Sequence, residues 1–130
     1  MKLLDANFVL RFLLKDHPLQ SQAVKEVLES KNETLLLQDL AVAEVVWVLT
    51  SVYKLSKEDI AEKIYNLLSL NSIFSNKSLL IRVLYFYRNF NISFIDAYLT
   101  AFCEQEKLEG IYSFDKGLDK IKLVKRFEPK

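Results

Sequence analysis

The stretch Thr34-Leu35-Leu36-Leu37-Gln38 decides the fold class of this 130-residue chain, because its three consecutive leucines predict a buried strand. A short, continuous apolar run is typical of a strand that is covered on both faces of a parallel sheet. A helix from about Leu40 to Tyr53 is expected directly after this strand. Further short apolar segments alternate with helical patterns along the chain, and this alternation indicates an α/β fold.

The remaining elements are predicted from apolar spacing, capping sequences and glycines. Ser56-Lys57-Glu58-Asp59 has the form of a capping box and opens one helix, and Gly110 ends another. No linker or repeat interrupts the chain, so we expect a single domain over residues 1–130, a helix-rich, three-layer α/β/α sandwich with a short, mainly parallel sheet. The other expected strands cover residues 3–4, 71–74, 111–113 and 123–125, and the other expected helices cover 7–14, 18–30, 56–70, 78–88, 93–107 and, as a short turn or helix, 116–121.

The composition excludes several classes of protein. A 51% apolar content supports a buried core, and a net charge of +1 gives no overall field that would indicate a nucleic-acid binder. Cys103 is the only cysteine and His17 the only histidine, which argues against Ser/His/Asp catalysis, a Cys/His nucleophile and zinc sites. Two glycines are too few for a phosphate-binding glycine-rich loop.

The N-terminus and the hydropathy of the chain predict where the protein acts. Asp5 and Arg11 interrupt the apolar opening segment, which makes it a poor signal peptide. No uninterrupted apolar run reaches the roughly 18 residues that a membrane-spanning helix needs. We therefore expect a soluble cytoplasmic protein.

Four acidic residues interrupt or close apolar segments: Asp5, Glu44, Asp96 and Asp115. An unpaired carboxylate in apolar surroundings is costly, and no Lys or Arg lies within four residues of Glu44 or Asp96. The carboxyl ends of parallel strands meet at one edge of a sheet, where the four side chains are expected to converge. A hard divalent cation is the partner that such a set of carboxylates favours.

Helix capping is the alternative explanation for three of these acids. Asp96 closes the capping-box sequence Ser93-Phe94-Ile95-Asp96, and Asp5 and Asp115 lie at strand-to-helix junctions, where Asp is a common N-cap. Glu44 lies beyond Asp39, the expected N-cap of its helix, and is too deep for a capping role. Its apolar neighbours predict that it faces a buried or half-buried site.

Residues near the four acids are candidates for supporting roles. Ser113 precedes Asp115 by two residues, so a strand would point both side chains to the same side, where the hydroxyl would orient the carboxylate. Asn7 is a candidate hydrogen-bond partner of Asp5, and Asp119 follows Asp115 by one helical turn; a solvent-facing position is the alternative for both. The basic residues near the acids are candidates for phosphate contacts or for an ordinary exposed face: Arg11, Lys15, Lys116 and Lys120.

Four short motifs together resemble the successive motifs of PIN-domain nucleases, and the chain most resembles the VapC toxins of toxin–antitoxin pairs. The motifs are Leu3-Leu4-Asp5-Ala6-Asn7, Ala43-Glu44-Val45-Val46-Trp47-Val48-Leu49, Ser93-Phe94-Ile95-Asp96-Ala97 and Tyr112-Ser113-Phe114-Asp115-Lys116. The resemblance implies that the four acids hold one or two Mg²⁺ or Mn²⁺ ions and that RNA is the substrate. It also implies a small antitoxin partner that covers the acidic site, and a homodimer. Ala6 departs from the Ser or Thr that many relatives carry after the first Asp, which raises a question about metal affinity.

The chemistry of phosphodiester hydrolysis agrees with this resemblance. Divalent metals on carboxylates can activate water and stabilise both the transition state and the leaving oxygen without His, Cys or Ser. We therefore expect a metal-dependent endoribonuclease, the toxin of a type II pair. Two alternatives remain: a catalytically inactive PIN-fold binding module, and a signalling receiver domain. The receiver domain would need an acidic pair after the first strand, and Asp5 has no acidic neighbour.

Overall fold

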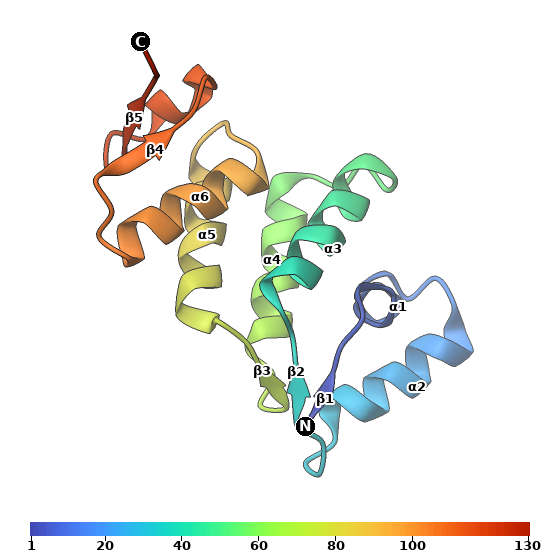
Figure 1. Cartoon of the computed structure of the whole chain (residues 1–130). Coiled ribbons are helices and arrows are strands. Elements are labelled where there is room, and N and C mark those ends of the chain that lie inside the picture. Colours follow the sequence, from blue (N-terminus) through green and yellow to red (C-terminus); the bar gives the residue numbers. More distant parts are fainter. The chain divides into compact units, whose positions relative to one another are not determined.

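Short strands alternate with helices along residues 1–130, all of which the computed structural model describes (Figure 1). The chain divides into two units, Met1–Lys77 and Ser78–Lys130. The elements of the first unit are β1 (Lys2–Leu3), α1 (Ala6–Leu14), α2 (Pro18–Glu29), β2 (Leu35–Leu36), α3 (Asp39–Ser51), α4 (Lys57–Leu68) and β3 (Ile73–Phe74). The second unit contains α5 (Lys77–Asn89, which begins at the boundary), α6 (Phe94–Gln105), β4 (Gly110–Tyr112), the 3₁₀-helix η1 (Lys116–Lys120) and β5 (Lys125–Phe127).

The first unit is built on a three-stranded parallel sheet in the order β1-β2-β3. The central strand pairs Leu35 with Lys2 on one side and with Ile73 on the other. The ladder is short, but the amides of Leu4 and Leu37 extend it by donating to the carbonyls of Leu36 and Phe74. Leu35 and Leu37 are almost fully buried, as the triple-leucine sequence predicts.

The helices of the first unit pack in sequence order: α1 against α2 and α3, α3 against α4, and α4 against β3. Ser56 caps α4 by accepting a hydrogen bond from the amide of Asp59, as predicted. The expected cap of α3 is wrong. Gln38 occupies the N-cap position without a side-chain bond, and Asp39 is the first helical residue. Its carboxylate accepts from the side-chain amide of Asn76, so tertiary contact decides its role.

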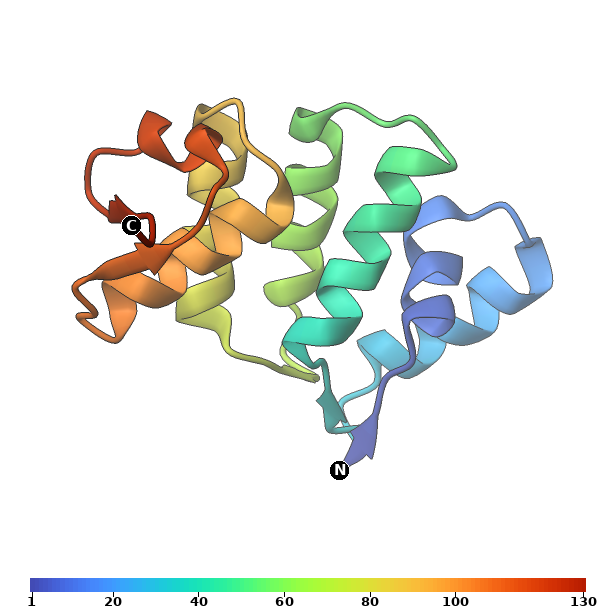
Figure 2. The same ribbon diagram turned by 45° about the horizontal axis from the view of Figure 1, so that its top comes forward.

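The second unit joins α5 and α6 to a parallel pair of strands, with α6 packed against β4 (Figures 1 and 2). The last strand lies at Lys125–Phe127, two residues later than the sequence predicts. Pairing with β4 sets this position, because it places Phe127 opposite Tyr112 with ring centroids 5.7 Å apart. Leu123, which suggested the earlier strand, is exposed.

The helix-rich α/β class with short parallel strands is confirmed. The strands fall into a three-stranded and a two-stranded sheet. No helix has the length and apolar content that crossing a membrane requires.

Candidate metal centre

Asp5 follows β1 directly and forms the N-cap of α1. Its Oδ2 atom accepts a hydrogen bond from the amide of Asn7 at 3.2 Å, so the Asn7 contact predicted for Asp5 is made by the backbone. The carboxylate is exposed, and capping engages only one of its oxygens. Capping and cation binding, which were alternatives in the sequence, are therefore compatible at this residue.

Glu44 lies in the second turn of α3 and lines a pocket of about 280 Å³ together with Asp5, Ala6 and Gln38. The structure thus brings two of the four acids to one pocket. The buried surroundings predicted for Glu44 are wrong, because its side chain is exposed. The buried face of α3 consists of Ala41, Val42, Val45, Val46 and Leu49.

Two exposed apolar residues explain why the sequence was misleading at Glu44. Leu40 is 78% exposed and Trp47 is 66% exposed, and both lie outside the buried stripe of α3, as Glu44 does. Because both faces of this helix are apolar, the run around Glu44 has almost no amphipathic pattern. Only packing reveals which side faces solvent.

Asp96 and Asp115 form the second acidic pair, in the second unit. Asp96 lies in the first turn of α6, where Ser93 caps the helix by accepting from the Asp96 amide at 3.1 Å. Partial burial raises the pKa of the Asp96 carboxyl, and a hydrogen bond and the charge of Asp115 raise it further, while the Ser93 hydroxyl lowers it. The Asp96 carboxyl therefore holds its proton more readily than an isolated aspartate does.

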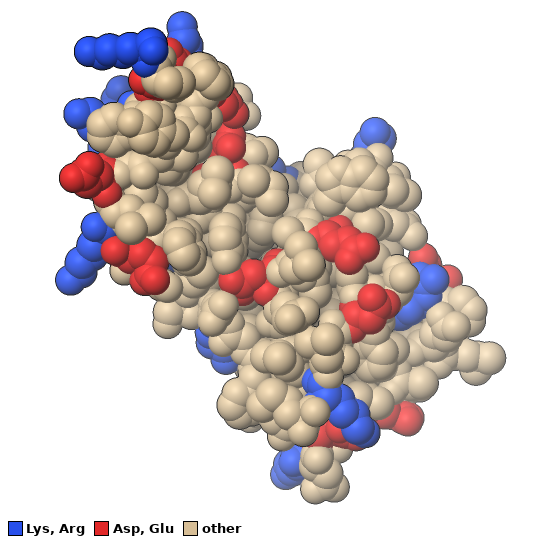
Figure 3. All heavy atoms as spheres, viewed as in Figure 1, with Lys and Arg blue, Asp and Glu red and all other residues tan.

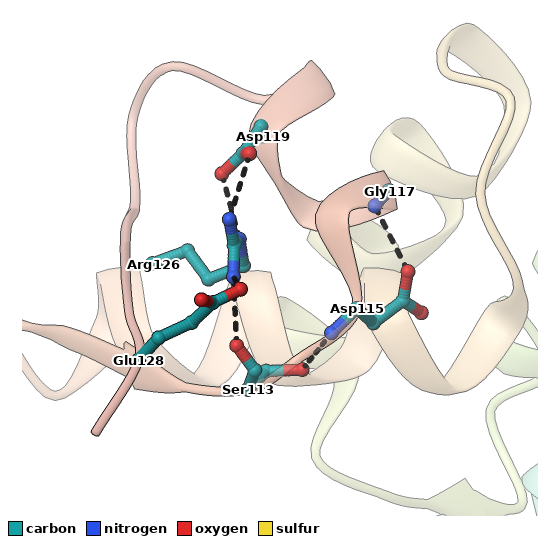
Figure 4. A network of polar contacts seen from close by, with 6 residues as sticks. All are labelled: Ser113, Asp115, Gly117, Asp119, Arg126 and Glu128. Carbon is teal, nitrogen blue, oxygen red and sulfur yellow. Dashed lines mark hydrogen bonds and ion pairs between the residues drawn. The ribbon is translucent and has the colours of Figure 1, made fainter. Parts of the chain in front are cut away.

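Asp115 is the N-cap of η1 (Figure 4). Its Oδ1 atom accepts from the Gly117 amide at 2.9 Å, and its own amide donates to the Ser113 hydroxyl at 2.9 Å. The hydroxyl of Ser113 therefore orients the backbone of Asp115, whereas the sequence predicted a contact with the carboxylate. As at Asp5, capping engages one carboxylate oxygen.

Arg126, on β5, fixes the segment that carries Asp115 (Figure 4). Its Nη1 atom donates to the Ser113 carbonyl at 2.9 Å, and its guanidinium binds both carboxylate oxygens of Asp119. This ion pair lowers the pKa of Asp119. Asp119 is thus engaged with Arg126, and nothing in the sequence marked Arg126 because it lies eleven residues after Asp115.

The four candidate phosphate-binding residues have different surroundings. Arg11 lines a pocket with Asp5, whereas Lys15 follows the end of α1 and lines another pocket. Lys116 is exposed directly after Asp115, and Lys120 donates to the Asn91 carbonyl at 2.9 Å. Acidic and basic side chains are interspersed on the face drawn in Figure 3, in agreement with the small net charge.

The donor chemistry of both acidic pairs fits a hard divalent cation. All the candidate ligands are carboxylate oxygens, which Mg²⁺ and Mn²⁺ prefer. A dication would also offset the like charges of Asp96 and Asp115, which together with burial raise the pKa of Asp96. Within neither unit do three or more His, Cys, Asp or Glu side chains gather as potential metal ligands.

Comparison with known proteins matches the chain to one family model. The family model described as the PIN domain matches residues 2–123, a range that includes all four acids. Among curated proteins, no match to the chain is found.

Proposed function

The chain belongs to the PIN-domain family, and on that premise we propose that it is a metal-dependent endoribonuclease. PIN domains are generally nucleases and typically use divalent metals. The receiver-domain alternative is set aside by this match. The main support for a metal-dependent endoribonuclease is the pairing of Asp96 with Asp115, together with the pocket that Asp5 shares with Glu44.

We assign the metal to Asp5, Glu44, Asp96 and Asp115, as one or two Mg²⁺ or Mn²⁺ ions. When bound, the cation supplies positive charge for the phosphodiester transition state and makes water more acidic. The caps at Asp5 and Asp115 fix the direction of each carboxylate, and a bound cation would favour the charged form of Asp96, whose pKa is raised by burial and by Asp115.

Basic residues supply the contacts to the RNA backbone in this proposal. Arg11, Lys15, Lys116 and Lys120 are the candidates. Arg11 is the best supported, because it lines a pocket with Asp5. Removing such charges should weaken RNA binding and reduce its dependence on salt.

We further propose that the protein is the VapC-like toxin of a type II pair, acting in the cytoplasm, as a homodimer, with a small antitoxin partner. The support is the resemblance of the four motifs. The segment Leu84-Tyr85-Phe86-Tyr87, a candidate dimer contact, is largely core, because only Tyr85 is exposed. A short, adjacent reading frame that encodes a DNA-binding fold would support the toxin assignment.

Cleavage of RNA by the purified protein tests the nuclease proposal. Mg²⁺ or Mn²⁺ should be required, and EDTA should stop the reaction. Asp5→Asn should reduce kcat/KM by at least about 100-fold, or ~2.7 kcal/mol. Asn is as good an N-cap as Asp, so this change removes the charge while α1 keeps its cap.

Glu44→Gln should reduce kcat/KM to a similar extent. Glu62→Gln is the matched control, because Glu62 is an exposed glutamate on α4, and it should leave kcat/KM unchanged. Cleavage that persists in EDTA, or that survives both site changes, would contradict the mechanism. RNA binding without any cleavage would favour the inactive binding module.

A further inference from the structure

A pocket of about 570 Å³ lies between α1 and α2, beside Asp5. Its lining comes from Asn7, Phe8 and Arg11 on α1 and from Gln20, Ala23 and Val24 on α2. The volume falls within the range of about 300–1,000 Å³ that is typical of small-molecule and cofactor sites. Gln20 has no sequence signal for this role, because only the packing of the two helices brings it to Asp5.

We propose that this pocket binds the nucleotide that flanks the scissile phosphate, with its base against the apolar wall and its phosphate at Arg11. The proposal rests on the proposed ribonuclease function and adds to it a subsite that selects the substrate. The main support for the proposal is that this pocket adjoins the candidate metal centre. Asp5 lines both this pocket and the pocket that contains Glu44.

The wall of the pocket suits a nucleobase. Phe8 is half-buried, Val24 is buried, and Ala23, which is exposed, has a small side chain that leaves room for a flat ring. Stacking of a base on an aromatic ring is the usual way in which proteins hold single-stranded nucleic acid, and it tolerates every base. The apolar wall of the pocket therefore contributes to affinity for any base and does not discriminate between bases.

Arg11 is held in place for a phosphate. Its Nε atom donates to the Gln20 side-chain oxygen at 2.8 Å, and its Nη1 atom lies 3.6 Å from Asp16. These contacts leave Nη2 for a ligand. They also hold the planar guanidinium in one orientation, with Nη2 placed to donate a charge-assisted hydrogen bond to a phosphate. The hydroxyl of Ser21 donates to the Arg11 carbonyl at 2.7 Å and fixes α2 against this turn.

Two side-chain amides give the pocket a means of selecting a base. The Gln20 oxygen is engaged by Arg11, so this amide presents its NH₂ group as a donor. The side-chain amide of Asn7 has no partner within the chain, because only its backbone binds Asp5. At the exocyclic position, guanine O6 and uracil O4 accept a hydrogen bond, whereas the amino groups of adenine and cytosine donate one. Guanine and uracil should therefore bind best.

A second pocket on the same helix pair provides the matched control. It has a volume of about 230 Å³, contains Lys25 and Gln22, and includes none of the four acids. Arg11 and Lys25 thus offer the same charge change in two pockets, and Gln20 and Gln22 offer the same amide change.

Nucleotide binding by the intact protein in EDTA tests the proposal without cleavage. The four ribonucleoside 5′-monophosphates are titrated while the methyl resonances of Ala23 and Val24 are followed by NMR. Both resonances should shift at saturation, with GMP or UMP binding most tightly. Arg11→Gln should weaken binding by about tenfold, the effect of losing one charge-assisted hydrogen bond, and Lys25→Gln by less than about twofold.

Gln20→Leu keeps Arg11 and should remove the difference in affinity between the four nucleotides. Gln22→Leu should preserve that difference. The pocket assignment is overturned if Ala23 and Val24 do not respond to any nucleotide, or if Arg11→Gln and Lys25→Gln weaken binding equally. Nucleotide binding here in a protein that cleaves no RNA would support the subsite and contradict the nuclease function. RNA cleavage by a protein whose Ala23 and Val24 methyl resonances do not respond to nucleotides would support the nuclease function and contradict the subsite.

Discussion

At the scale of single residues, Asp5 and Asp115 combine two roles that the sequence presented as alternatives. Each caps a helix through one carboxylate oxygen, accepting from the amide two residues further on. A cap engages only part of a carboxylate, so the same residue can hold a helix start and face a cation. For such residues, capping in a structure is no argument against metal binding.

The raised pKa of Asp96 predicts the pH dependence of stability without metal. A carboxyl whose pKa is higher in the folded protein stabilises the fold most below the pKa of the unfolded chain, about 3.9. That contribution is lost as the pH rises through the folded pKa, where the charged form faces burial and Asp115. In EDTA, the melting temperature of the wild type should therefore fall relative to that of Asp96→Asn between about pH 4 and pH 7.

Melting curves of both proteins at each pH, recorded in EDTA, provide the measurement. Glu62→Gln corrects for the general effect of removing one exposed acid. A difference between wild type and Asp96→Asn that stays constant over this range, or that grows in favour of the wild type, would show that the two carboxyls do not repel each other.

At the scale of elements, the β4–β5 pair depends on a close approach at Gly110. A Cβ atom at this position would collide with the Lys125 backbone carbonyl of the neighbouring strand. A Cβ at Gly117 would lie 2.9 Å from Asp115 Oδ1, which is the end of a side chain and can move. The same change, Gly to Ala, therefore tests a strand pair at one position and a candidate metal ligand at the other.

Gly110→Ala should lower the free energy of unfolding by about 1–3 kcal/mol, the usual cost of overpacking. Gly117→Ala should alter stability less, but it should weaken the rise in melting temperature that Mn²⁺ causes. Urea unfolding in EDTA and thermal melting with Mn²⁺ separate the two effects. The opposite pattern, with a stable Gly110→Ala protein and an unchanged Mn²⁺ response in Gly117→Ala, would contradict both local interpretations.

At the scale of the whole molecule, each unit carries one acidic pair, and the family match runs through both units. If the four acids bind the same metal, as proposed, then loss of either pair should remove most of the binding. Mn²⁺ at 100 times its Kd should stabilise the wild type by about 2.7 kcal/mol. Asp5→Asn and Asp96→Asn should each abolish most of this gain, and the double variant should lose little more.

Stability measured against Mn²⁺ concentration for the four proteins of this cycle gives the coupling between the two changes. Strictly additive losses would indicate two independent sites and would contradict a shared centre. Glu62→Gln, combined with either change, provides the additive reference.

The sequence by itself determined the α/β class, most helix boundaries to within a few residues, and the family. These features depend on local spacing, capping residues and short motifs, which a linear pattern records directly. Ser56 and Ser93 cap helices where their sequences predict it. The candidate acids were visible for the same reason, since each interrupts a short apolar segment.

Only the tertiary structure decided what each of these side chains contacts. Asp39 binds Asn76, Arg126 binds the Ser113 segment, and Gln20 joins Asp5 in a pocket, all between residues that lie far apart in sequence. The exposure of Glu44 was hidden because apolar residues also cover the solvent face of α3. Strand position near the C-terminus likewise followed from pairing with β4, because the register of a strand is fixed by its partner and by burial rather than by composition.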